Sequence, residues 1–178
     1  MKKINVITAI IFAAISSGAV AGDGKITFKG EVVKQSCVVE GSDKSKTVTL
    51  PKVSSNALQT AGDTTGTTPF TIQLSKCAAA ETVTDVGLSF IGPNIDLATR
   101  TLNTAGVGTT TAKNVNIALY NQNDQLIKLG MDKDNQNVGF TKLAEGNVQL
   151  NYVAKYYALG ISEPGLVESN VDFEIIYK

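Results

Sequence analysis

Two cysteines, Cys37 and Cys77, are the residues of this sequence with the most chemistry open to them. A cysteine pair can form a disulfide, contribute to a metal site or supply a reactive thiol. In an exported protein an isolated pair favours the disulfide, because oxidising compartments let such a bond form and persist. Closing the loop between them would stabilise the fold by about 4 kcal/mol on the chain-entropy model. We therefore expect a Cys37–Cys77 disulfide.

The sequence contains no histidine, and this removes most catalytic arrangements. Without histidine there is no usual general base, and the commonest metal ligand is missing. The glycine-containing stretch 62–66 lacks the lysine of a phosphate-binding loop. A carboxylate pair could act without histidine, but the acidic residues fall mostly in expected turns or on outward strand positions. We expect no catalytic residue, no metal site and no cofactor, and so no enzyme.

The first 21 residues predict an export signal. A basic start at Met1–Lys3 precedes the mostly apolar run Ile4–Ile15, and Ala19–Ala21 is a small-x-small cleavage pattern, with cleavage after Ala21. A membrane anchor is the alternative, but the apolar run is too short to cross a bilayer comfortably. Removing residues 1–21 leaves 157 residues, the size of one domain. The lysine-led signal and the cysteine pair suit a bacterial periplasm.

The mature chain would carry 14 basic and 16 acidic residues. This near balance argues against a nucleic-acid partner, which needs a concentrated basic surface. The densest charge cluster, Asp43–Lys46, is mixed in sign and indicates a solvated loop. The polar stretch Asp132–Asn137 indicates a turn.

Strict alternation of apolar and polar residues is the dominant pattern, and it predicts strands with one buried face. In the stretch Gly24–Val33 one face carries Ile26, Phe28, Gly30 and Val32, and the other carries Lys25, Thr27, Lys29 and Glu31. Further strands are expected at Lys34–Val39, Thr47–Leu50, Phe70–Leu74, Thr84–Phe90, Asn114–Leu119, Leu126–Ile127, Val148–Tyr156 and Val171–Lys178. Short strands separated by turn signals predict an all-β, immunoglobulin-like sandwich.

The chain resembles the major pilins of chaperone–usher fimbriae of the type 1-like group. The stretch Phe28–Val33 stands a few residues before the first cysteine, and Val48–Pro51 precedes the second, as in those pilins. Near the end, Gly165 is fourteenth from the C-terminus and Tyr177 is penultimate. These features together span essentially all of the mature chain.

The resemblance implies an incomplete immunoglobulin-like sandwich whose missing strand comes from another subunit. The implied division is a signal peptide at 1–21, an N-terminal extension at 22–33 and a pilin domain at 34–178. Ile26, Phe28, Gly30 and Val32 would insert into the groove of a neighbouring subunit, with Gly30 where the groove is too shallow for a side chain. The implied C-terminal motif, which the assembly chaperone grips, comprises Gly165, Phe173, Ile175 and Tyr177.

The implied partners are identical or homologous pilin subunits, a periplasmic chaperone and an outer-membrane usher. The implied location is a fimbria on the bacterial surface, reached through the periplasm. Two alternatives stay open. The chain could be a single-domain adhesin or a minor or adaptor subunit that meets a host receptor, and its leading strand could pair within its own domain.

Overall fold

The computed structural model describes residues 25–30, 32, 37–78, 83–104 and 110–178. The chain divides into two units, Met1–Val33 and Lys34–Lys178. The strands all lie in the second unit: β1 Val38–Val39, β2 Thr64–Cys77, β3 Asp85–Ile91, β4 Ile95–Asp96, β5 Thr101–Leu102, β6 Lys113–Asn121, β7 Thr141–Lys142, β8 Gly146–Glu163 and β9 Asp172–Tyr177. Two short 3₁₀ helices, η1 (Gly41–Ser45) and η2 (Ser55–Ala57), precede β2. No helix in these described ranges is long and apolar enough to cross a membrane.

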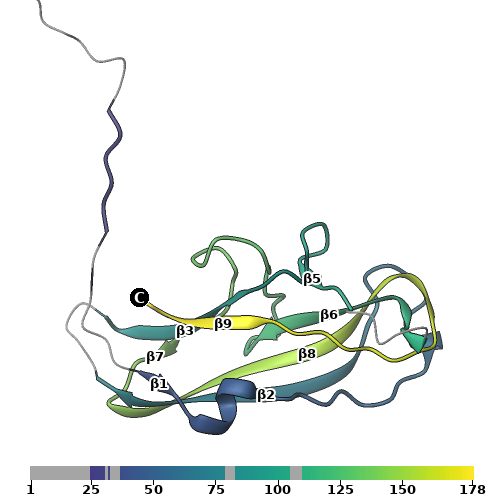
Figure 1. The fold of residues 1–178 in the computed structure, drawn as a ribbon, viewed down its shortest axis with the longest axis horizontal. Coiled ribbons are helices and arrows are strands. Elements are labelled where there is room, and N and C mark those ends of the chain that lie inside the picture. Colours follow the sequence, from purple (N-terminus) through teal and green to yellow (C-terminus); the bar gives the residue numbers. More distant parts are fainter. Residues whose placement is uncertain (1–24, 31, 33–36, 79–82, 105–109) are drawn as a thin grey trace, which may run out of the picture. The chain divides into compact units, whose positions relative to one another are not determined.

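The strands form two sheets that face each other (Figure 1). The larger sheet has the order β1-β2-β8-β6-β5-β4, and the smaller sheet has the order β7-β3-β9. Every pairing between these strands is antiparallel. The predicted immunoglobulin-like sandwich is therefore confirmed.

The core lies between the two sheets, because each sheet turns one row of apolar side chains inward. On β8, Leu150 and Tyr152 are almost fully buried, whereas Gln149 and Asn151 beside them are exposed. Tyr152 joins the two layers, since its ring centroid lies 5.2 Å from that of Phe90 on the smaller sheet. The alternation in the sequence therefore correctly predicts which face of β8 is buried and which is exposed.

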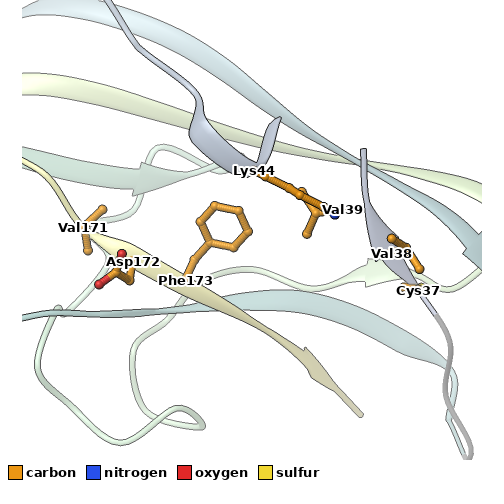
Figure 2. A pocket seen from close by; sticks show the side chains of 7 residues that line it. All are labelled: Cys37, Val38, Val39, Lys44, Val171, Asp172 and Phe173. Carbon is orange, nitrogen blue, oxygen red and sulfur yellow. The ribbon is translucent and has the colours of Figure 1, made fainter. Parts of the chain in front are cut away.

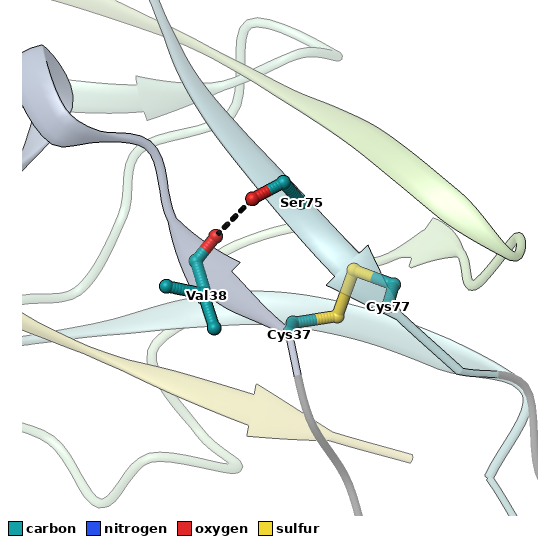
Figure 3. Close-up of a disulfide and its surroundings, with 4 residues drawn as sticks. All are labelled: Cys37, Val38, Ser75 and Cys77. Atoms are coloured by element: carbon teal, nitrogen blue, oxygen red, sulfur yellow. Dashed lines mark hydrogen bonds between the residues drawn. A yellow bond between two sulfur atoms is a disulfide. The ribbon is translucent and has the colours of Figure 1, made fainter.

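The predicted disulfide between Cys37 and Cys77 is present and joins the start of β1 to the end of β2 (Figure 3). Beside it, β1 pairs with β2 through Val38 opposite Ser75. The Ser75 hydroxyl also donates to the Val38 carbonyl oxygen, with 3.5 Å between the oxygens. The disulfide and this hydrogen bond hold β1 at the edge of the larger sheet.

Several element predictions were wrong. The stretch 126–127 makes only an isolated bridge, between Tyr120 and Leu126. The short strands β4, β5 and β7 were not predicted, because two residues are too few for a visible alternation. The strand β2 begins at Thr64, before the predicted Phe70, and β8 continues past Tyr156 to Glu163.

Candidate docking groove

The strand β9 has one paired edge and one open edge. It pairs with β3 from Ile91 opposite Asp172 to Val86 opposite Tyr177. On its other side no strand of the described chain follows, since β9 ends the order of the smaller sheet. An open edge presents unpaired backbone N–H and C=O groups, and these can receive a strand from another chain.

The opposite edge of β3 is covered near both of its ends. Near its start β3 pairs with β7, through Val86 opposite Thr141. At Phe90 the buried side chain of Gln136 takes the place of a strand. Its amide oxygen accepts from the Phe90 N–H at 2.9 Å, and its amide nitrogen donates to the Phe90 carbonyl oxygen at 2.9 Å.

The segment 46–50 lies across the groove from β9 as a second rim. Val48 and Leu50 are half-buried and pack against the core, whereas Thr47 and Thr49 are exposed. The predicted strand at Thr47–Leu50 is nevertheless wrong. Outside the helices and strands of the described chain, no backbone–backbone hydrogen bond involves residues 47–53, so the alternation is present without a ladder.

Each end of this rim segment is held by one side chain. At its start, the Lys46 ammonium lies 2.6 Å from the carboxylate of Asp43, which is itself buried. At its end, the Tyr156 hydroxyl donates to the Pro51 carbonyl oxygen at 3.1 Å. The rim is thus positioned by side chains while its backbone groups stay available.

Between the rims lies a groove with a volume of about 820 Å³. Its apolar floor comes from both sheets and comprises Phe70, Ile72, Phe90, Leu102, Ile117, Leu119, Ala154 and Tyr156. A smaller cavity of about 460 Å³ adjoins it between β1 and β9 and shares Lys44, Val171, Asp172 and Phe173 with it. Figure 2 shows the Phe173 ring reaching from β9 toward Val39 and Lys44.

Apolar side chains around the groove are only partly covered. Those packed against the core but still partly exposed include Val39, Val48, Leu50, Phe70, Val167, Val171 and Phe173. Contiguous apolar surface of this kind marks an interaction site or an aggregation hazard. The groove therefore has the chemistry of an apolar docking site with a backbone ladder on β9.

Three of the four predicted C-terminal residues share the inward face of β9. Phe173, Ile175 and Tyr177 are half-buried and stand opposite the buried β3 residues Phe90, Leu88 and Val86. Burial raises the pKa of Tyr177, and a backbone hydrogen bond with Cys37 opposes that rise. Phe173 lines the groove, whereas Ile175 and Tyr177 pack into the same core beyond it.

Gly165, the fourth, has a steric reason to be glycine. A Cβ there would lie 2.5 Å from the Thr110 carbonyl oxygen and closer still to the Ala112 amide nitrogen. The two segments meet through two backbone hydrogen bonds of the next residue, from the Leu166 N–H to the Thr110 carbonyl oxygen at 2.7 Å and from the Ala112 N–H to the Leu166 carbonyl oxygen at 2.9 Å. A side chain at 165 would force these backbones apart.

The predicted inserting residues lie in the N-terminal unit and are exposed. Ile26, Phe28 and Val32 have exposed fractions of 80%, 89% and 102%. Gly30 has no atom within 4 Å of where a Cβ would stand. Residues 25–30 and 32 have no assigned secondary structure, so the strand expected at Gly24–Val33 is not formed there. The predicted signal peptide and cleavage site at Ala21 lie outside the described residues.

Sequence reasoning missed two buried polar residues that shape the groove. Asp43 lies in a cluster read as solvated, yet it is 5% exposed, and Gln136 lies in a stretch read as a polar turn, yet it is 1% exposed. Each binds a distant backbone group, Gln73 for Asp43 and Phe90 for Gln136, and no local pattern could reveal those contacts. Within the described ranges no group of histidine, cysteine, aspartate or glutamate side chains is arranged to hold a metal ion.

Comparison with known proteins agrees with this architecture. The family model for fimbrial proteins matches residues 26–178. The chain is 41% identical to the F17 fimbrial protein of Escherichia coli, over the full length of both. It is 37% identical to the major fimbrial subunit SMF-1 of Stenotrophomonas maltophilia, covering 94% of this chain and 99% of that one.

Among solved structures, the P pilus rod subunit PapA is similar in fold. The TM-score is 0.62 at 18% identity, and the match covers 80% of this chain and 99% of PapA. The structure of a chaperone–usher pilus matches with a TM-score of 0.61 at 22% identity, covering 88% of this chain and 96% of that one. The chain therefore belongs to the fimbrial protein family.

Proposed function

We propose that this protein is the structural subunit of a surface fimbria and polymerises by donating its N-terminal extension to the groove of a neighbouring copy. The open edge of β9 above an apolar groove is the observation that carries this proposal. The same chain carries an alternating segment whose apolar side chains are exposed. Groove and segment are complementary in chemistry, and adding a strand to a sheet edge is an established mode of peptide recognition.

The energy available is large enough to hold a fibre together. Burying Ile26, Phe28 and Val32 would contribute about 5–8 kcal/mol from apolar area. Each ladder hydrogen bond formed with β9 or with the rim segment 46–50 would add about 1 kcal/mol. An open groove would leave a free subunit prone to aggregation, and this supports a requirement for a chaperone until the donor strand arrives.

The route to the surface follows from the predicted signal and the disulfide. An export signal at residues 1–21 would deliver the chain to an oxidising periplasm, where Cys37 and Cys77 can pair. A periplasmic chaperone would occupy the groove, with Phe173, Ile175 and Tyr177 on the strand that it contacts. An outer-membrane usher would then exchange the chaperone for the next subunit's extension. Relatives bearing the names of major fimbrial subunits support the structural role over an adhesin or a minor subunit.

Replacing one inward residue and one outward residue of the extension tests this function. We expect Phe28→Lys to abolish surface fibres, because a charge would enter the apolar groove. Thr27→Lys is the matched control, since Thr27 lies on the opposite face by alternation, and it should leave fibres on the surface. Electron microscopy of cells that produce each variant gives the readout. Normal fibres from Phe28→Lys would overturn the proposal.

A further inference from the structure

We propose that Asp172 and Glu174 form an acidic row on the solvent face of β9 that pairs with Lys25 and Lys29 of the incoming extension and sets its register. This inference rests on the proposed function, because it needs the extension beside β9. In this inference, charged residues on the solvent side of the interface help to determine in which register the apolar residues of the extension enter the groove.

The two acidic residues are exposed and lack a cationic neighbour on the paired side of β9. Across the ladder Asp172 stands opposite Ile91, and Glu174 stands opposite Ser89. In the described chain neither carboxylate takes part in an ion pair. Lys178, further along the same face, has its ammonium 4.1 Å from the centroid of the Phe140 ring. On the free side, Lys44 lines the same smaller cavity as Asp172 but makes no ion pair with it among the described residues, so both carboxylates can accept a cation from an incoming strand.

Alternation places the basic residues of the extension in the same row. Phe173, Ile175 and Tyr177 face the core from β9, so Asp172 and Glu174 face away from it. If Ile26, Phe28 and Val32 enter the groove, then Lys25 and Lys29 must face solvent beside the acidic row. This follows from side-chain parity alone. Both lysines are exposed in the free extension and take part in no ion pair in the described residues.

Charge then distinguishes between registers that have the same inward face. All pairings between the strands of this fold are antiparallel, and in an antiparallel pair with Lys29 opposite Asp172, Thr27 stands opposite Glu174. Lys25 and Lys29 then flank Glu174 on both diagonals, within reach of long side chains. Phe28 would stand opposite Phe173, which lines the groove.

A slip by two residues keeps the apolar residues inward but spoils the charges. A slip that brings Glu31 opposite Asp172 and Lys25 opposite Lys178 creates two like-charged pairs, against the single opposite-charged pair of Lys29 with Glu174. Directly opposed like charges destabilise a ladder, whereas opposite charges stabilise it. The row therefore favours the register with Lys29 opposite Asp172 over this slip. A slip in the other direction keeps one opposite-charged pair, Lys25 with Glu174, and is opposed instead by the loss of Phe28 from its place opposite Phe173.

Exchange of the two charges is the direct test in intact fibres. Lys29→Glu and Asp172→Lys should each lower the yield of sheared fibres about two- to fivefold, the range that one cross-strand pair gives. The double variant carries both changes and restores opposite charges, so its yield should return close to wild type. The loss in each single variant should also shrink when fibre dissociation in urea is measured at 1 M NaCl, because salt screens exposed charges.

Carbodiimide cross-linking reads the register itself. It should join Lys29 of one subunit to Asp172 of the next, which mass spectrometry can identify in the covalent dimers left after fibres are dissociated. Lys29→Arg keeps the charge but offers no amine, so its fibres should form and lack this link.

Two outcomes would overturn the inference: a double variant no better than the worse single one, or a Lys29 cross-link that forms with Glu174 or another residue in place of Asp172. Fibres that survive Phe28→Lys would instead overturn the proposed function. The two failures are thus distinguishable.

Discussion

The carboxylate of Asp43 accepts a hydrogen bond from the backbone N–H of Gln73, with 2.7 Å between oxygen and nitrogen across 30 residues of sequence. Just before this contact, β1 ends and the chain turns into η1. The Glu40 N–H donates to the Gln73 carbonyl oxygen at 2.9 Å. The Asp43 carboxylate pairs the N–H of the same residue, so both backbone groups of Gln73 are paired although β1 has already ended. The Lys46 ammonium binds the other carboxylate oxygen, so one buried side chain anchors the start of the groove rim.

We expect Asp43→Asn to destabilise the fold by about 1–3 kcal/mol at neutral pH, since it weakens charge-assisted hydrogen bonds. The hydrogen bond from Lys46, followed by that from Gln73, lowers the pKa of Asp43 below the ordinary aspartate value of 3.8. A lowered pKa in the folded state contributes stability above the unfolded value, and this is lost as pH falls through the folded pKa. Urea unfolding should therefore show a difference between Asp43→Asn and wild type that shrinks below pH 3.8.

Asp134→Asn is the control for this measurement. Asp134 is exposed and lies 3.3 Å from the ammonium of its neighbour Lys133, so its replacement should change stability by less than about 0.5 kcal/mol. Equal unfolding curves for Asp43→Asn and wild type at pH 7 would contradict the anchoring role.

Gly165→Ala should destabilise the fold by about 1–3 kcal/mol, as overpacking does elsewhere. The added methyl group would occupy the space of the backbone at 110–112 and disrupt the hydrogen bonds around Leu166. Gly160→Ala is a matched control, because nothing lies within 4 Å of a Cβ there and its backbone is not left-handed. Thermal unfolding followed by circular dichroism would compare the two. Wild-type stability of Gly165→Ala would remove the steric explanation for this glycine.

Local periodicity was enough to predict most of the sandwich. A strand repeats every two residues, so Val148–Tyr156 reveals its buried face without knowledge of its neighbours. At Thr47–Leu50 the alternation is present, but the ladder is not, because no strand of the described chain lies beside it. A hydrogen-bonded ladder depends on a partner, and composition alone cannot show whether that partner is in the same chain.

Buried polar residues were the least predictable part of the groove. Asp43 and Gln136 both look like loop residues, because aspartate and glutamine in polar stretches are usually solvated. Each is hydrogen-bonded to a backbone group that lies 30 or 46 residues away in the sequence. Such contacts follow from the completed fold, so they are visible only once the sheets have been placed.

Replacing both cysteines with serine should lower the free energy of unfolding by about 4 kcal/mol on the chain-entropy model. The disulfide closes a loop with a sequence separation of 40 and holds β1 against the end of β2. Without the disulfide the unfolded chain gains conformational entropy. The strand β1, whose Val38 and Val39 line the smaller cavity, is then held less firmly against β2. We expect a reduced level of Cys37→Ser/Cys77→Ser subunit in the periplasm, measured by immunoblot of periplasmic extracts. An unchanged level would show that the bond is dispensable for folding.

Gln136→Leu should be among the most damaging single substitutions outside the apolar core. The Gln136 amide binds three backbone groups, the N–H and C=O of Phe90 and the C=O of Met131 at 3.1 Å. Leucine has a similar size but would leave all three buried groups without this partner, at about 1–3 kcal/mol for each group that water cannot reach. The edge of β3 at Phe90 would also lose its cover, so the variant should aggregate more readily.

Gln149→Leu separates this effect from a general loss of glutamine. Gln149 is exposed on β8 and bonds only the side chains of Gln73 and Asn151 among the described residues. Its replacement should change the unfolding midpoint in urea by little, whereas Gln136→Leu should lower it clearly. Light scattering of both variants during refolding would then report aggregation. If Gln136→Leu matches Gln149→Leu in both measurements, then β7 alone is sufficient to close that edge of β3, and the amide of Gln136 is not what confines strand addition to β9.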